Sequence, residues 1–160
     1  MRAQRMRRGT KNILPPPDDG QASVEFALVL VIVMFVIFWA FELLMLLYTY
    51  TVMADAAKEG VRYAVVHGCG NSTCSGPCSP ACSDATGANV ATTVLGYAKE
   101  SLHNTSNLSL GSGITVSYPD NSAEAPSRVQ VVINYVYQPY FSFGWTPPTI
   151  SAAAEGRILN

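Results

Sequence analysis

Four cysteines, the only ones in the chain, follow one another in the pattern Cys69-x4-Cys74-x3-Cys78-x3-Cys82. Cysteines at such spacing bind zinc or pair as disulfides, and His67 offers a further ligand for a metal. Disulfides are favoured if the loop lies in an oxidising compartment. We therefore predict two disulfides rather than a metal site. Four cysteines allow three pairings, and the sequence does not select one.

Two carboxylates lie at or within an apolar segment, where a charged side chain costs free energy unless it has a partner. Glu25 lies five residues after Gly20, at the start of a long apolar stretch, and Glu42 lies inside that stretch. Glu25 is either solvated and favoured by the positive end of a helix dipole, or, after a cut behind Gly20, close to a new amine on Gln21 or on a neighbouring subunit. Glu42 lies either at the headgroup layer or against another helix. The sequence leaves both choices open.

Catalytic signatures are not found in the sequence. It contains no Gly-x-Ser-x-Gly, phosphate-binding loop, His-Glu-x-x-His or dinucleotide fingerprint, and its only histidines are His67 and His103. The formal net charge is -1, which gives no reason to expect a nucleic-acid partner. We predict a protein that is not an enzyme and that needs neither a cofactor nor a metal.

The apolar stretch, residues 26–47, is interrupted only by Glu42. A transmembrane helix needs about 20 mostly apolar residues, and no polar face breaks residues 26–41. Half of the ten lysines and arginines precede this stretch, so the N-terminus is expected in the cytoplasm and the chain after about Tyr50 outside. An ordinary secretory signal would be shorter and would end in a small-x-small site. We therefore expect a retained single-pass span.

Two motifs carry a family resemblance. Residues 20–28 read Gly-Gln-Ala-Ser-Val-Glu-Phe-Ala-Leu, and residues 56–64 read Ala-Ala-Lys-Glu-Gly-Val-Arg-Tyr-Ala. The first resembles the prepilin-peptidase site of type IV pilins and pseudopilins. Together, over residues 20–65, the motifs resemble the TadE-like proteins of bacterial tight-adherence (Tad) pili.

The resemblance implies a membrane protein used in pilus assembly and adhesion. It implies cleavage by a prepilin peptidase between Gly20 and Gln21, an inner-membrane location, and assembly contacts through Glu25. Its implied partners are other pilins or pseudopilins, an assembly ATPase and the platform proteins of the Tad system, with self-association through the helix possible. The alternative hypothesis is an uncleaved single-pass protein whose disulfide-stapled domain binds a ligand.

The rest of the chain predicts an α+β fold. We expect a basic leader at 1–20, a transmembrane helix and stalk at 21–67, and an extracytoplasmic domain at 68–160 with a Cys-rich loop at 69–82. The stalk has a face of small residues that packs on its own domain or on a neighbouring subunit.

The domain is expected to contain a second helix and about three antiparallel strands. Helical spacing predicts the helix over 84–103, capped by Asp84 or Thr86, and alternation predicts strands near 114–118, 128–137 and 149–159. An aromatic cluster between the last two strands is expected to cover the sheet rather than to form a binding patch; its members are Tyr140, Phe141, Phe143 and Trp145.

Overall fold

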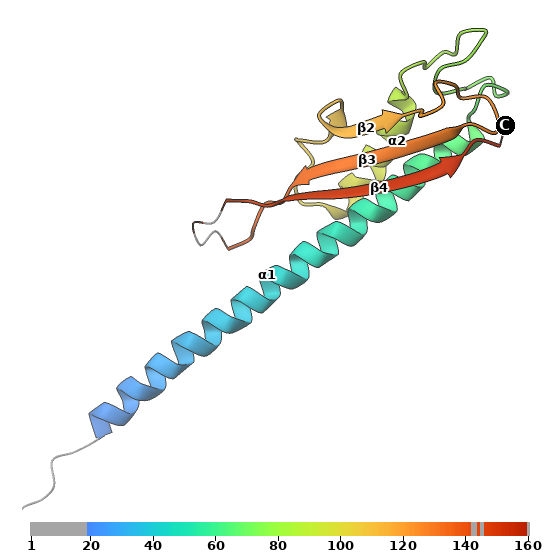
Figure 1. Cartoon of the computed structure of the whole chain (residues 1–160). Coiled ribbons are helices and arrows are strands. Elements are labelled where there is room, and N and C mark those ends of the chain that lie inside the picture. The colour runs from blue at the N-terminus through green and yellow to red at the C-terminus, as the bar shows by residue number, and fades with distance from the viewer. Residues whose placement is uncertain (1–18, 142–143, 145, 160) are drawn as a thin grey trace, which may run out of the picture. The chain divides into compact units, whose positions relative to one another are not determined.

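The computed structural model describes residues 19–141, 144 and 146–159 of the 160-residue chain. Residues 1–18, which hold most of the predicted leader, lie outside the described residues, as do Phe143 and Trp145. The chain divides into two compact units, Met1–Phe38 and Trp39–Asn160. Two helices and a four-stranded sheet make up the described structure, and the fold is α+β as predicted (Figure 1).

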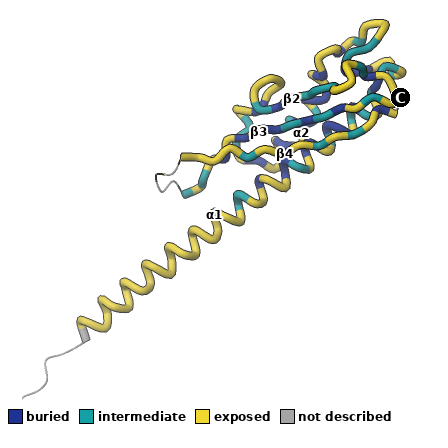
Figure 2. The backbone as a smooth tube through the Cα atoms, viewed as in Figure 1, coloured by how far each residue is buried: buried dark blue, intermediate teal, exposed yellow. Residues whose placement is uncertain are grey.

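Helix α1, Asp19–Val66, begins and ends within a few residues of its predicted bounds. Every side chain from residue 20 to residue 41 is exposed, although most of them are apolar (Figure 2). Among the described residues α1 is the only helix long and apolar enough to cross a membrane. An apolar helix without a buried face is stable only if lipid or another protein surrounds it.

The second half of α1 has one buried face. Its buried residues recur every three or four positions, and they are mostly small: Thr49, Val52, Met53, Ala56, Ala57, Gly60, Val61 and Ala64. The small-residue face predicted from the sequence, Ala54, Ala57, Val61, Ala64 and Val65, shares Ala57, Val61 and Ala64 with this buried face, whereas Ala54 and Val65 are only half-buried at its border. The buried face packs into the hydrophobic core of the chain's own domain. The opposite face is charged and carries two ion pairs, Lys58–Asp55 and Arg62–Glu59.

The sheet has four strands in the order β1-β2-β3-β4. Their bounds are Ser109–Leu110, Gly113–Ser117, Arg128–Val136 and Thr149–Arg157. The predicted set of about three antiparallel strands corresponds to β2, β3 and β4, which pair antiparallel. The prediction missed β1, which pairs parallel with β2 and makes the sheet mixed. A two-residue strand is too short to show an alternation of apolar and polar residues.

Both helices cover the same face of the sheet. On β3 every second residue is buried, namely Val129, Val131, Ile133 and Tyr135, as the alternation predicted. Helix α2, Ala88–Ser101, turns Val90, Ala91, Val94 and Ala98 into this core. Its first residue, Ala88, lies four residues after Asp84 and follows the N-cap Gly87, so the helix predicted over 84–103 was four residues too long at its start and two at its end.

At Gly60, helix α1 closely approaches both α2 and β3. A Cβ built on Gly60 would collide with Val94 of α2, and it would lie 3.5 Å from Val90 and 3.6 Å from Val131 of β3. Gly96 is the matched case on α2, because a Cβ there meets nothing within 4 Å.

We expect Gly60→Ala and Gly96→Ala to have opposite effects on stability. Both substitutions gain the same helix propensity of about 1 kcal/mol. Gly60→Ala also overpacks a core that contains rigid Val94, at about 1–3 kcal/mol. Circular dichroism of the detergent-solubilised chain gives the Tm of each variant. The difference between the two Tm values reports the cost of a Cβ where α1 approaches α2 and β3. Equal Tm values would contradict this close approach.

Candidate functional site

The predicted processing segment forms the first turns of α1. The side-chain amide of Gln21 donates a 3.2 Å hydrogen bond to Glu25 Oε1, with both side chains exposed. Residues four apart lie on the same face of a helix. Gly20 is exposed, and nothing lies within 4 Å of the position that a Cβ would take.

This arrangement suits the role that the resemblance implies for Glu25. A cut between Gly20 and Gln21 would create an amine one helical turn before the Glu25 carboxylate. That separation is about 6 Å along the helix axis. An opposite charge at such a distance favours the charged carboxylate in a medium of low dielectric constant. Cleavage and this pairing stay predictions.

Glu42 is held by the connection between β3 and β4. Its Oε1 accepts a 2.7 Å hydrogen bond from the Tyr137 hydroxyl and one of 3.2 Å from the Tyr140 backbone N–H. Its Oε2 accepts a 3.3 Å bond from the Phe141 backbone N–H. We call these four residues the Glu42 clasp. The Phe41 and Phe141 rings meet edge to face beside it, with centroids 6.4 Å apart.

The clasp explains how an acid is tolerated in this apolar stretch. A carboxylate in a poorly hydrated place costs much less when donors satisfy its oxygens. Burial and the hydrogen bond to Glu42 together raise the pKa of Tyr137, so its hydroxyl remains a donor. The two interpretations drawn from the sequence, a headgroup location and a partner helix, both missed these donors from the same chain. Tyr137 is 95 residues away in sequence, so no local pattern points to it.

Two residues of the aromatic cluster after β3, Tyr140 and Phe141, belong to the Glu42 clasp. Tyr140 and Phe141 fold against α1 through their backbone N–H groups, whereas Phe143 and Trp145 lie outside the described residues. The described part therefore covers α1 next to the sheet. Tyr140 itself remains 58% exposed, and its ring lies beside that of His103.

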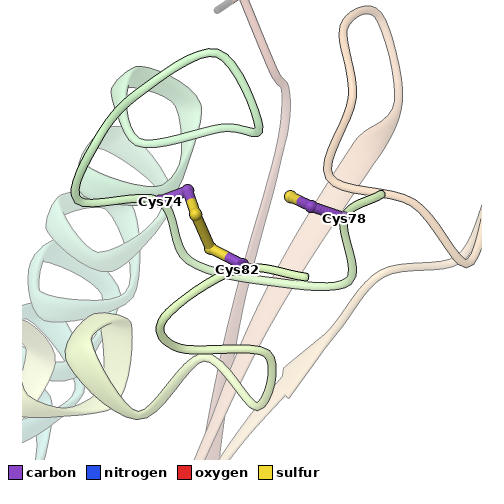
Figure 3. Close-up of side chains that lie close together, drawn as sticks. All are labelled: Cys74, Cys78 and Cys82. Atoms are coloured by element: carbon purple, nitrogen blue, oxygen red, sulfur yellow. A yellow bond between two sulfur atoms is a disulfide. The ribbon is translucent and has the colours of Figure 1, made fainter. Parts of the chain in front are cut away.

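The four cysteines form two disulfides, Cys69–Cys78 and Cys74–Cys82. The prediction of disulfides is thus confirmed, and the structure supplies the pairing that the sequence left open. The two bridges interleave along the chain, so each closes a short loop that contains one cysteine of the other. Figure 3 shows the Cys74–Cys82 bond and the Cys78 side chain beside it.

The zinc alternative fits this arrangement less well. The sulfurs of Cys74, Cys78 and Cys82 lie within 4.8 Å of one another, but each belongs to a disulfide and has no thiolate to offer. His67 lies at the end of α1, where its ring stacks on Tyr63 at a centroid distance of 3.9 Å. Its Nδ1 is 2.9 Å from the Tyr63 carbonyl oxygen.

Asp84 ties the Cys-rich loop to α2. Its carboxylate accepts hydrogen bonds from the Ser75 hydroxyl at 2.7 Å and from the Ala88 and Asn89 backbone N–H groups at 2.9 and 2.7 Å. Neither Asp84 nor Thr86 is the N-cap residue, which is Gly87, but Asp84 satisfies the first N–H groups of α2 from three residues before that position. Burial acts to raise the pKa of Asp84, but these bonds and one from Thr86 outweigh it and hold the pKa below its usual value.

Replacing Glu42 by Ala should release the β3–β4 connection. The Tyr140 and Phe141 N–H groups then lose a charged acceptor, worth about 1.5–3 kcal/mol per bond, and should exchange with solvent at least about tenfold faster. Hydrogen–deuterium exchange with mass spectrometry of the peptide covering residues 137–141 measures this. Glu59→Ala, which breaks only a surface ion pair, is the control. Unchanged exchange in Glu42→Ala would show that the clasp does not hold the connection.

Asp84→Asn should destabilise the domain at neutral pH and cease to do so in acid. The folded pKa of Asp84 is depressed, so its contribution is complete above the unfolded pKa of about 3.9 and is lost as the pH falls through the folded pKa. We expect a cost of about 1–3 kcal/mol at pH 7 that shrinks below about pH 3. Thermal melts across pH test this, with the exposed Asp55→Asn as control. A cost that does not depend on pH would refute the role of the charge.

A comparison with known protein families finds a match on helix α1. Residues 20–62 match the family model described as TadE-like protein. No curated protein and no solved structure matches the chain. The matched segment begins at Gly20, includes Glu25 and Glu42, and ends at Arg62 on the stalk part of α1. Over residues 20–62 the chain is therefore similar to TadE-like proteins, and this segment includes the helix that is long and apolar enough to cross a membrane.

Proposed function

We propose that the chain is a minor pilin or pseudopilin that assembles or anchors a Tad pilus and is processed after Gly20. The observation that carries the proposal is the match to the TadE-like family over a helix whose first half is apolar and exposed. Such a helix inserts into a membrane and, after extraction, can pack against the helices of other subunits. The proposal assigns no catalytic step to this chain.

The proposed topology is a single pass through the inner membrane with the N-terminus in the cytoplasm. The basic residues before the span support this orientation. The two disulfides support it as well, because they persist in the oxidising space outside the cytoplasm. We propose the domain division accordingly: a leader at 1–20, the span and stalk at 21–67, and the extracytoplasmic domain at 68–160.

The Glu42 clasp supports an upper end of the proposed membrane span near residue 41. Side chains of α1 are exposed up to Phe41, whose ring already meets Phe141, and at Glu42 the hydrogen bonds to the β3–β4 connection begin. Residues 21–41 extend about 30 Å at about 1.5 Å per residue, which is the thickness of a bilayer's hydrocarbon core. We therefore place the span at residues 21–41, ending before the hydropathy boundary at residue 47.

Glu25 is the proposed assembly residue. Once Gln21 carries the new amine, Glu25 lies one turn along the helix and is available to the amine of its own chain or of the next subunit. A buried carboxylate with such a partner favours one register between neighbouring helices. The proposed partners are the prepilin peptidase, other pilins or pseudopilins, and the Tad assembly platform.

The first test is the N-terminal residue of the chain extracted from cells with an active prepilin peptidase. We expect an intact mass that corresponds to a chain starting at Gln21. Gly20→Leu should leave the leader attached, because the side chain before the scissile bond no longer fits a site for glycine. A wild-type chain that still starts at Met1 would favour the alternative, an uncleaved single-pass protein with a binding domain.

The second test separates assembly from insertion. Glu25→Val should abolish incorporation into pili while the chain still enters the membrane, because the change removes a charge and keeps the helix apolar. Glu59→Val, which removes an acid from the stalk part of α1, is the matched control. Immunoblots of sheared pili and of washed membranes provide the two readouts. Normal incorporation of Glu25→Val would exclude Glu25 as the assembly residue.

A further inference from the structure

Two cavities adjoin the Glu42 clasp on the domain. The first, which we call the apolar groove, has a volume of about 150 Å³. The second, which we call the polar cavity, has a volume of about 470 Å³. Tyr137 and Pro139 line both, so the two cavities share a wall.

The apolar groove is lined by hydrocarbon. Its walls are Trp39, Leu43 and Leu46 of α1 and Tyr137, Pro139, Phe141, Thr146, Pro147 and Pro148 of the β3–β4 connection. Its one acid is Glu42, whose oxygens are occupied by the clasp. Such a lining attracts an alkyl chain and offers almost nothing to a polar ligand.

The polar cavity has hydroxyl, amide and aromatic groups instead. Its polar lining consists of Tyr48, Thr49, Ser101, His103, Asn104, Tyr135, Tyr137, Gln138 and Tyr140. No Lys, Arg, Asp or Glu is among the described residues that line it. The His103 and Tyr140 rings stand 6.2 Å apart, tilted by 41°. Neutral donors and acceptors beside aromatic rings suit a ligand with several hydroxyl groups and apolar C–H faces, such as a sugar ring.

Charge narrows the choice of ligand further. The described lining of the polar cavity holds no Lys or Arg, so His103 is its one basic side chain for pairing with a phosphate or a carboxylate. The Glu42 carboxylate in the wall of the adjoining apolar groove repels an anion. An uncharged ligand is therefore preferred.

The walls of the polar cavity are already fixed by hydrogen bonds. Asn104 Nδ2 donates to Gln138 Oε1 at 3.1 Å, and the Tyr135 hydroxyl donates to the Asn104 carbonyl oxygen at 2.8 Å. These bonds join the end of α2 to the end of β3. A site whose walls are held in place loses less entropy when a ligand binds.

The position of the cavities along α1 indicates where the ligand comes from. Trp39, Leu43 and Met45 contribute to their walls and lie at the end of the proposed membrane span or just after it. An alkyl chain in the groove and a hydroxyl-rich group in the polar cavity belong together in one amphipathic molecule at this level.

We propose that the two cavities bind one membrane lipid with an uncharged sugar headgroup: an acyl chain lies in the apolar groove and the sugar in the polar cavity. The proposal rests on insertion of α1 into the membrane and not on cleavage or on a role in pili. Its failure and that of the proposed function are therefore distinguishable.

The test uses the full chain in nanodiscs that contain equal amounts of monoglucosyl diacylglycerol, phosphatidylethanolamine and phosphatidylglycerol. Native mass spectrometry of the protein released from the discs shows which lipid is retained. We expect the glucosyl lipid to be enriched at least about fivefold over either phospholipid. Equal retention of the three lipids, or enrichment of either phospholipid, would overturn the proposal.

Two pairs of variants assign the binding to the cavities. Leu43→Gln places an amide in the apolar groove, whereas Leu44→Gln makes the same change one residue along, at a side chain that lines neither cavity. Leu43 is 49% exposed and Leu44 65% exposed, so both substitutions should be tolerated. Gln138→Ala removes a polar wall, and Asn134→Ala is its control on β3 outside both cavities. We expect enrichment to be lost in the first member of each pair and kept in the second.

A last arm distinguishes a lipid from a free glycan. Octyl glucoside carries a sugar and an alkyl chain, whereas methyl glucoside carries the sugar alone. We expect saturation-transfer NMR to give at least about tenfold tighter binding for octyl glucoside, with the difference lost in Leu43→Gln. Equal binding of the two glucosides would show that the site takes a free glycan, and it would overturn the lipid proposal.

Discussion

Helix α1 has an exposed apolar half and a half that packs in the protein core. The rest of the structure depends on the residue at which one half changes to the other. Up to Phe41 its side chains are exposed and apolar, whereas from Thr49 onward it buries a face of small residues in a protein core. Glu42 lies at this change and is held by three hydrogen bonds from the β3–β4 connection. Because backbone N–H groups supply two of these bonds, the contact fixes the connection itself against the helix, and with it the end of the sheet.

The domain that follows Glu42 along α1 is small, and several kinds of contact stabilise its limited core. Close approach at Gly60 lets two helices and a strand share one layer of valines and alanines. Interleaved disulfides then constrain a loop that has too few apolar residues to pack by itself. Asp84 connects that loop to the start of α2 through Ser75 and two backbone N–H groups. Each of these contacts compensates for the limited core of a short chain.

The sequence predicted what is local and missed what is not. The long apolar helix, the second helix, the alternation of β3 and the contact of Asp84 with the start of α2 all follow from neighbours within a few residues, and the structure has them. The strand β1 was missed because two residues carry no period. The partners of Glu42 and the pairing of the cysteines were also beyond prediction, because Tyr137 and the bridge geometry depend on the folded chain. The one sequence signal for the Glu42 contact was the presence of an acid inside an apolar stretch. It indicated that the carboxylate needs a partner but did not identify that partner.

The clasp also connects the position of the domain to the shape of its cavities. Tyr137 donates to Glu42 and is a wall of both cavities, so the residue that satisfies one oxygen of this carboxylate also lies between an apolar groove and a polar cavity. If the acid were absent, an apolar helix face would pack against the β3–β4 connection with no fixed register, since hydrophobic contact is not directional. A carboxylate accepts hydrogen bonds only from defined directions, so Glu42 can set the register of the β3–β4 connection along α1. The cost is the free energy of removing the carboxylate from water. On this reasoning Glu42 fixes how far the domain reaches down the helix.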